Sequence, residues 1–266
     1  MTLLHDGSFE GMLSAAAHAL AHGMPEAVMA EDQWQPGLFA DTERIETDAF
    51  SARTLAARLR DDVSRRTFKN VAYCWLSELP GSGLHAARYI GLALELGSRV
   101  DSYHAHDAVI AVHRIAGKVG GEIHRLCGLA RFREMKDGTL FAPVKPDYNV
   151  VCPIALHFRR RLHNERWAVC DVGRGTGVRW TGASFEVVGL AAGAPLMDFD
   201  HAEGVFSDDE ARWRPLWQAY FAAIAVRTRT NPRLQRQYMP RRYWPYLVEE
   251  PGSSRRLAPP GGRGRS

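Results

Sequence analysis

The stretch EIHRLCGLARFRE, residues 122–134, marks the point where the chain changes from helical to strand periodicity. Before it, apolar residues recur at three- and four-residue steps from Val109 to Leu126, which predicts one buried face of a helix. After it, the pattern leads into Asp137-Gly138, a dipeptide typical of a two-residue hairpin turn. We therefore predict a helix that ends near the beginning of this stretch and a strand that begins directly after it.

The sequence before this stretch carries helical patterns only. Ser8 is suited to cap a helix from Phe9 to about Ala21, and further apolar stripes follow after residue 47. Residues 24–44 show no regular period. We therefore predict a helical first half, over about residues 1–127.

The sequence after this stretch carries short strand patterns around one helix, which is predicted from about Val151 to Leu162. With the hairpin, the segments 167–172, 177–181 and 185–188 make about five short antiparallel strands. A C-terminal helix is predicted from Ser207 to about Arg229. The expected fold is an α+β single domain over residues 1–250 with a sheet-containing half from about 128, followed by a disordered tail over 251–266.

The formal net charge of +4 does not by itself indicate a nucleic-acid partner. The tail 251–266 holds four arginines and no acid, so the rest of the chain is neutral. No apolar run has the length of a membrane span, and no basic-then-apolar leader opens the chain. A cytoplasmic protein that does not contact membranes is expected.

The sequence offers no dedicated site for a metal or a cofactor. The four cysteines form no C-x-x-C pair, and the histidines form no H-E-x-x-H set. The glycine-rich run 173–177 resembles a phosphate loop, but no lysine and no helix follow it, so a turn between strands explains it better. We expect neither a bound metal nor a cofactor.

Catalysis has three candidate residues. His124 lies near a predicted helix end, where a histidine can act as a general base beside a carboxylate. Glu122 is two residues away and Asp6 is distant in sequence, so a partner carboxylate has to come from elsewhere in the fold. A structural histidine is the plain alternative, and whether the protein is an enzyme stays open.

The C-terminal region is the main candidate for nucleic-acid contact. From Ala211 to Val248 there are eight arginines, eight aromatic residues and no acid. Arginine forks suit phosphate oxygens, and aromatic faces stack on bases. Trp213, Trp217 and Tyr220 are nevertheless expected to be core, whereas Tyr243 and Trp244 fit core and contact equally. For Arg125, near a predicted helix end, the plain alternative is that it stabilises the helix dipole. The candidate residues, including three arginines of the central region, are Arg125, Arg131, Arg133, Asn231, Arg233, Gln235, Arg236, Arg241, Arg242, Tyr243 and Trp244.

Several motifs together give the chain a family resemblance that runs to about Glu250. They are HDGSFEG (5–11), LSELPG (76–81), EIHR (122–125), GLARFRE (128–134), Asp147, His157-Phe158, Asp171, NPRLQR (231–236) and MPRRYW (239–244). The chain resembles a bacterial family of unknown function described as probable DNA metabolism proteins. It departs from that family at His5, where a tyrosine is usual, and at Leu129, where a phenylalanine is usual.

This resemblance implies a DNA repair or modification context. Members of the family that the chain resembles are encoded beside a radical-SAM protein, and some are fused to a uracil-DNA glycosylase-like domain. The resemblance therefore implies a radical-SAM protein and a uracil-DNA glycosylase-like protein as partners. The first hypothesis is a DNA-binding accessory protein. The alternatives are an enzyme acting on damaged DNA or a nucleobase, and a docking module for the radical-SAM protein.

Overall fold

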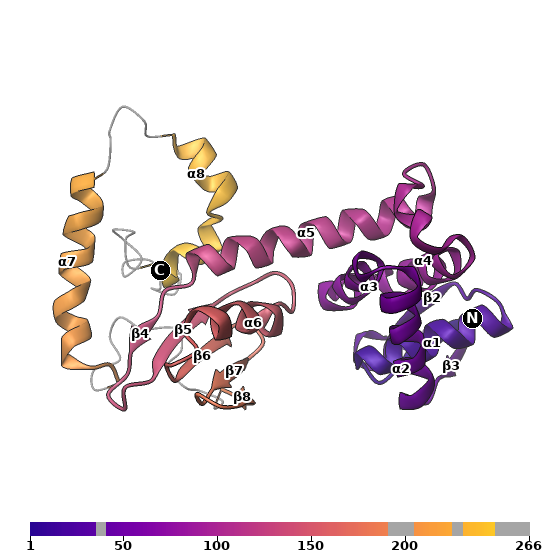
Figure 1. Ribbon diagram of the computed structural model, residues 1–266, viewed down its shortest axis with the longest axis horizontal. Helices are drawn as coiled ribbons and strands as arrows, with labels where there is room; N and C mark the ends of the chain where they lie inside the picture. Colours follow the sequence, from indigo (N-terminus) through magenta and orange to yellow (C-terminus); the bar gives the residue numbers. More distant parts are fainter. Residues whose placement is uncertain (36–40, 191–204, 225–230, 248–266) are drawn as a thin grey trace, which may run out of the picture. The chain divides into compact units, whose positions relative to one another are not determined.

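The structure is a computed structural model that describes residues 1–35, 41–190, 205–224 and 231–247 (Figure 1). It divides into two compact units, Met1–Gly121 and Glu122–Ser266. The division falls within one long helix, close to the change of periodicity that the sequence shows. Each unit is described by itself.

The first unit surrounds a small parallel sheet with helices. Its elements are β1 (Thr2–His5), α1 (Phe9–His22), β2 (Ala27–Ala30), η1 (Glu31–Gln33), β3 (Thr42–Arg44), α2 (Ala49–Ala57), η2 (Arg58–Val63), α3 (Arg65–Ser77), α4 (Ser82–Leu96), η3 (Gly97–Ser102) and the first part of α5 (Asp107–Leu129). The sheet has the order β2-β1-β3, and both neighbours of β1 run parallel to it.

The helices of the first unit begin where polar side chains cap them. Ser8 accepts a hydrogen bond from the backbone N–H of Gly11, as predicted for α1. Asp48 does the same for two N–H groups at the start of α2. The core of this unit includes Leu3, Ala15, Ala19 and Val28. Helix α4 approaches β2 so closely that a side chain at Gly83 would meet the carbonyl oxygen of Val28.

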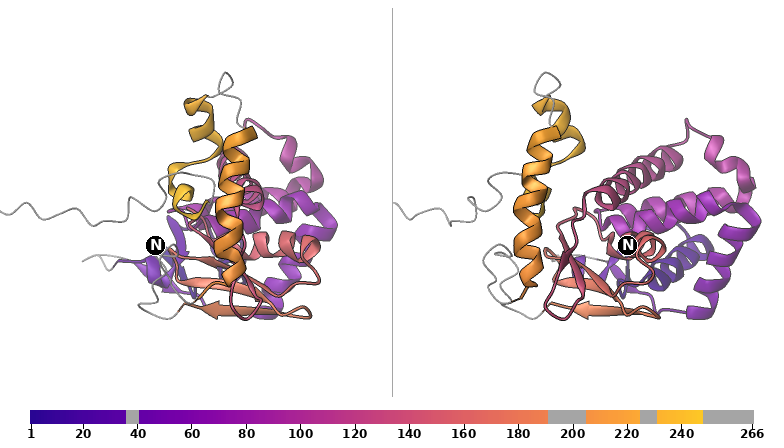
Figure 2. Two further views of the ribbon diagram at one scale, coloured as in Figure 1. Left: turned by 90° about the vertical axis from the view of Figure 1, so that its left-hand side faces the viewer. Right: turned by 60° about the vertical axis from the view of Figure 1, so that its left-hand side comes forward.

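The second unit is built on a five-stranded sheet. Its elements are the end of α5, then β4 (Arg133–Glu134), β5 (Leu140–Val144), α6 (Val151–Arg161), β6 (Trp167–Asp171), β7 (Thr176–Trp180), β8 (Phe185–Gly189), α7 (Asp208–Ile224), α8 (Pro232–Tyr238) and η5 (Arg241–Tyr246). The strands lie in sequence order, β4-β5-β6-β7-β8. Helix α6 packs on β6 and β7, and Figure 2 shows it against one face of the sheet.

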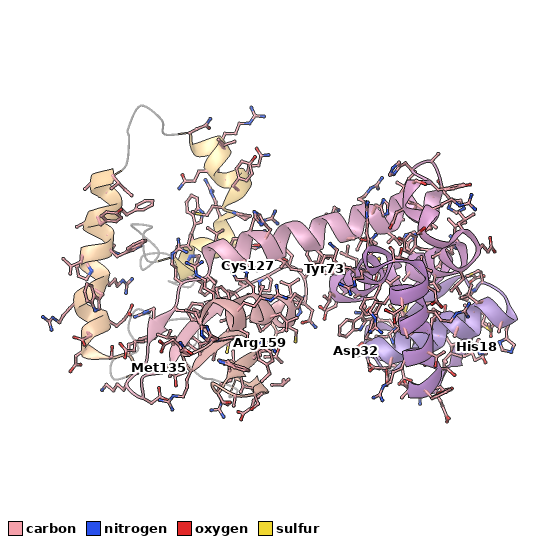
Figure 3. The ribbon with its side chains drawn as sticks, in the orientation of Figure 1. His18, Asp32, Tyr73, Cys127, Met135 and Arg159 are labelled. Atoms are coloured by element: carbon pink, nitrogen blue, oxygen red, sulfur yellow. The ribbon has the colours of Figure 1, made fainter. Side chains whose placement is uncertain are left out.

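The core of the second unit lies on both faces of β6, whose five residues are all buried. One cluster joins Phe141, Ala168 and Cys170, with Met135 of the hairpin packed against them (labelled in Figure 3). On the α6 side, the rings of Phe158 and Trp167 meet edge to face. Because both faces are covered, β6 reads as an apolar run rather than an alternation.

The α+β class is confirmed, but three details of the prediction are wrong. The first half is not helical throughout, because β1, β2 and β3 are three- or four-residue parallel strands, too short to show a period. The strands of the second unit are not all antiparallel, since β5 and β6 are parallel. The α6 crossover between them returns the chain to the same end of the sheet, which makes that pair parallel.

The third correction concerns the Asp137-Gly138 hairpin. Met135 pairs with Thr139, which leaves a three-residue loop rather than a two-residue turn. Gly138 takes a left-handed φ of 76°, and the Asp137 carboxylate accepts a hydrogen bond from the Thr139 backbone at 2.9 Å. The dipeptide therefore marks the hairpin correctly, but with a longer loop.

No helix of the described ranges has the length and apolar character needed to cross a bilayer. The tail 251–266, for which disorder is predicted, lies outside the described residues, as does the predicted end of the C-terminal helix near Arg229. The run 173–177 forms the turn after β6 and the first two residues of β7, so it connects two strands, as predicted.

Candidate nucleic-acid interface

The end of α5 carries a buried carboxylate. Glu122 is fully buried, whereas His124 two residues on is exposed, because alternate positions on a helix face in different directions. Arg125 is half-buried on the same turn. The motif EIHR thus places one side chain in the interior of the second unit and one in solvent.

Glu122 accepts hydrogen bonds from four donors that come from two distant parts of the unit. The hydroxyl of Tyr243 donates to Oε1 at 2.5 Å, and Nη2 of Arg242 donates to the same oxygen at 2.7 Å. The backbone N–H groups of Asp147 and Tyr148 donate to the two carboxylate oxygens at 3.1 and 2.9 Å. The carboxylate therefore ties the loop after β5 and the segment η5 to α5.

This environment keeps Glu122 ionised. Burial is the largest influence on its pKa and acts upward, but the hydrogen bonds from Tyr243, Arg242 and the two backbone groups outweigh it, so the pKa lies below 4.5. Burial and the neighbouring carboxylate raise the pKa of Tyr243, which stays a neutral donor. The group functions as a fixed anion that organises its neighbours.

Segment η5 holds its side chains in unlike environments. Tyr243 is 2% exposed and belongs to the core. Arg242 also reaches Asp147 at 2.8 Å and is therefore bound to two carboxylates. Trp244 is half-buried and donates from Nε1 to the carbonyl of Met239, and the exposed Arg241 lies over its ring. Of the candidates in this segment, Arg241 and Trp244 are the ones that solvent reaches without breaking an ion pair.

A second ion pair, between Asp171 and Arg174, supports the loop at residues 146–147. It was not predicted from the sequence. Asp171, at the end of β6, is fully buried and accepts hydrogen bonds from Gly173 N, Arg174 N and Arg174 Nη1. Arg174 also donates to the carbonyl of Asp147 at 3.0 Å. The only signal in the sequence was the turn that follows the strand, which places an arginine three residues after an aspartate.

Arg131 and Arg133 do not lie on the same strand. The strand β4 begins at Arg133, and Arg131 precedes it, donating to the carbonyl of Gly128 at 3.0 Å. Arg133 is largely buried, pairs with Glu210 at 3.3 Å and lies 3.6 Å from the ring centre of Phe206. Arg133 therefore fastens the start of α7 to the hairpin.

Helix α7 begins beside β4, where Met135 and Phe206 form a bridge (Figures 1 and 2). The expectation that Trp213, Trp217 and Tyr220 are core is wrong. Their exposed fractions are 66%, 43% and 54%. Together with Arg131, Phe132, Glu210, Arg214 and Leu216 they line a groove of about 480 Å³.

Helix α8 presents mostly exposed polar side chains. Asn231 caps it by accepting a hydrogen bond from Leu234 N at 3.0 Å, so this candidate has a structural role. Arg233, Gln235 and Arg236 are exposed. Among the residues that the structure describes, the side chains of Arg233 and Arg236 have neither a hydrogen bond nor an ion pair.

Asp6, the remaining catalytic candidate, lies in the first unit, whereas Glu122 and His124 lie in the second. Its carboxylate accepts hydrogen bonds from Ser8 and Thr47. The side-chain hydrogen bond from Ser8 is the main cause that lowers its pKa. The structure brings Glu122 and His124 onto one helix end, and the catalytic roles of all three stay predictions.

A cluster of polar side chains surrounds Asp101 in the first unit, and it was not predicted from the sequence. Asp101 accepts hydrogen bonds from the Tyr89 hydroxyl and from Nε2 of His113, both at 2.7 Å, and from Asn70 at 3.3 Å. Its burial acts to raise its pKa, but the bonds from Tyr89 and His113 hold it lower. An ionised carboxylate cannot donate, so Nε2 of His113 carries the proton. No spacing rule links these positions in the sequence.

The described residues contain no group of three or more His, Cys, Asp or Glu placed to hold a metal. All four cysteines are free thiols, and burial raises the pKa of Cys170 to about 11.

Comparison with known proteins places the chain in a family. The model of DUF4130, a domain of unknown function, matches residues 80–249. The chain belongs to this family. The match includes the whole second unit as far as η5, with the Glu122 cluster and the α7 groove. No curated protein and no solved structure gave a significant match.

Proposed function

We propose that this DUF4130 protein is a DNA-binding accessory protein that acts in DNA repair or modification in the cytoplasm, beside a radical-SAM or glycosylase-like partner. The observation that carries the proposal is the surface of the C-terminal helices. Trp213, Trp217 and Tyr220 of α7 are exposed, and so are Arg233 and Arg236 of α8, whose side chains have no hydrogen bond or ion pair in the described part of the chain. Rings and guanidinium groups are the two contacts that sequence-tolerant nucleic-acid binding needs.

The charge distribution supports this surface over the rest of the chain. Although the body of the protein is neutral, the segment 211–247 contains arginines and no acid. The arginines nearer the core are already committed to carboxylates, as Arg242 is to Glu122 and Arg133 is to Glu210. We therefore expect the exposed arginines, which include Arg233, Arg236 and Arg241, to make the phosphate contacts.

The test is a titration of labelled single-stranded and duplex DNA at two salt concentrations. Phosphate binding releases counterions, so affinity falls steeply between about 50 and 200 mM salt. Arg233→Ala with Arg236→Ala lowers the salt slope by about 2, since each phosphate contact contributes about 1. The matched control is Arg53→Ala with Arg88→Ala, which removes two exposed arginines from the first unit. Affinity that does not change with salt contradicts the proposal.

A second candidate function is docking of the partner protein through α7. It is favoured by Leu216 and Ile224, which are 59% and 54% exposed, because aliphatic side chains add little to base stacking. On this hypothesis Ile224→Asp, which lies outside the groove lining, abolishes binding to the purified radical-SAM protein and spares DNA binding. Loss of DNA binding alone contradicts it.

A further inference from the structure

The groove between α7 and the residues that precede β4 lies entirely in the second unit. Its volume is about 480 Å³, within the range of small-molecule sites. Side chains project from α7 along its length (Figure 3). Phe132 belongs to the groove lining and also packs edge to face on Phe158, at 4.7 Å between ring centres. One wall of the groove is therefore fixed to the core.

The other wall is a continuous row of side chains on one helical face. Trp213, Leu216, Trp217 and Tyr220 follow a spacing of three, one and three residues, so they share one face of α7. At 1.5 Å per residue, the row from Trp213 to Tyr220 is about 10 Å long. The row carries three rings, those of Trp213, Trp217 and Tyr220, and each offers a face on which one base can stack.

The charges of the lining suit a polyanion. Arg131 and Arg214 contribute two cations, and Glu210 is the acid of the lining. Glu210 is 15% exposed and pairs with Arg133 at 3.3 Å, so its charge is offset where it stands. A phosphodiester that follows the rim therefore meets guanidinium groups, whereas a base that enters the groove meets rings.

We infer that the α7 groove binds about three unstacked bases of single-stranded DNA. The inference rests on the proposed DNA-binding function and adds its substrate class. A duplex keeps its base faces stacked and offers only edges to a convex helix, so it cannot use the rings of Trp213 and Trp217. A protein partner would need no cations at the rim. The rings and the cations together select a single strand.

The experiment compares a single-stranded oligothymidine of about 12 nucleotides, the matching duplex, and an oligomer of the same length with abasic sites throughout. Anisotropy reports affinity, and quenching of tryptophan fluorescence reports stacking. The test variant is Trp213→Ala with Trp217→Ala. The control is Phe50→Ala, which removes a ring that is 82% exposed in the first unit. Circular dichroism verifies that each variant is folded.

We expect the double variant to bind oligothymidine about tenfold or more weakly, since each stacked base contributes roughly 1–3 kcal/mol. The affinity of the double variant for the duplex should equal that of the wild type. Phe50→Ala should bind oligothymidine as tightly as the wild type does. The abasic oligomer should bind the wild type weakly and should not quench its tryptophan fluorescence. Equal binding of abasic and normal strands, or an equal loss for strand and duplex, overturns the groove assignment while DNA binding survives. Absence of binding to all three probes overturns the proposed function as well.

Discussion

Arg242 and Glu122 form an ion pair at 2.7 Å, although 120 positions separate them in the chain. The pair joins the last described segment of the second unit to the end of α5. Glu122 is fully buried, and Arg242 is 30% exposed. The C-terminal arginines are therefore divided between a structural set, which this pair represents, and an exposed set on α8 and at Arg241.

The first prediction concerns the stability contributed by this cluster. Glu122→Ala removes the acceptor of four hydrogen bonds and leaves the Tyr243 hydroxyl buried without it. Breaking a buried pair costs about 3–5 kcal/mol, and we expect a value near the lower end because Arg242 is partly solvated and keeps Asp147. Urea unfolding measures the loss.

Tyr243→Phe provides a smaller change of the same cluster. It deletes one hydrogen bond to a charged acceptor and should cost about 1.5–3 kcal/mol. Its matched control is Tyr220→Phe, which removes a hydroxyl from a 54% exposed ring. Equal effects of the two substitutions would contradict the assignment of Tyr243 to the anchor.

The second prediction is a pH dependence that Glu122 causes. Its pKa in the folded protein lies below the ordinary 4.5, so the unfolded chain binds its proton more tightly. The ionised group therefore contributes stability above about pH 4.5, and this contribution disappears as the pH falls through the folded pKa.

Glu122→Gln cannot titrate, so the difference in unfolding free energy between wild type and variant should be largest near pH 7 and should shrink toward about pH 3. Urea midpoints over this range measure it. Asp6, Asp48 and Asp101 also have lowered pKa values, but they are present in both proteins and cancel in the difference. A difference that is constant with pH would show that folding does not lower the pKa of Glu122.

The sequence predicted the elements whose signals are local. The cap at Ser8 and the helix α6 follow from residues within one or two turns of each other. The β4–β5 hairpin was identified because Asp137-Gly138 has its own backbone preference. The strands of the first unit were missed, since TLLH, AVMA and TER are too short to carry a period.

The candidate site was predicted less completely, because its contacts are not local. From the sequence, Glu122 was predicted to be catalytic and Arg242 to bind nucleic acid. Nothing in their spacing indicates that the two side chains form an ion pair. The exposure of Trp213 on α7 was also missed. A stripe of rings at helical spacing is the same pattern whether a core or solvent covers it, so only the fold distinguishes the two.

The third prediction concerns Asp101 of the first unit. Asp101→Asn replaces an acceptor with an amide that cannot accept all the bonds from Tyr89, His113 and Asn70. We expect a loss of about 2–3 kcal/mol, as for hydrogen bonds to a charged group. Asp62→Asn, which changes an exposed aspartate of η2, should leave stability unaltered. Thermal unfolding of both variants tests this, and equal melting temperatures would contradict the role of Asp101.

The fourth prediction separates an exposed aromatic face from a core. Trp167 is fully buried between α6 and the sheet, whereas Trp213 and Trp217 are 66% and 43% exposed. Trp167→Ala should cost about 3–5 kcal/mol because it removes buried area and leaves a cavity. Trp213→Ala and Trp217→Ala should each change stability by no more than about 0.5 kcal/mol, which is typical of surface positions.

Urea unfolding of the three single variants measures these differences under one set of conditions. The comparison is sharp because the same substitution is made at each position, so differences in helix or strand propensity are small beside the cavity effect. If Trp213→Ala destabilised the protein as much as Trp167→Ala, the α7 face would be covered in solution. Its rings would then be unavailable to bases, and the exposed arginines of α8 would remain as the sites for DNA contact.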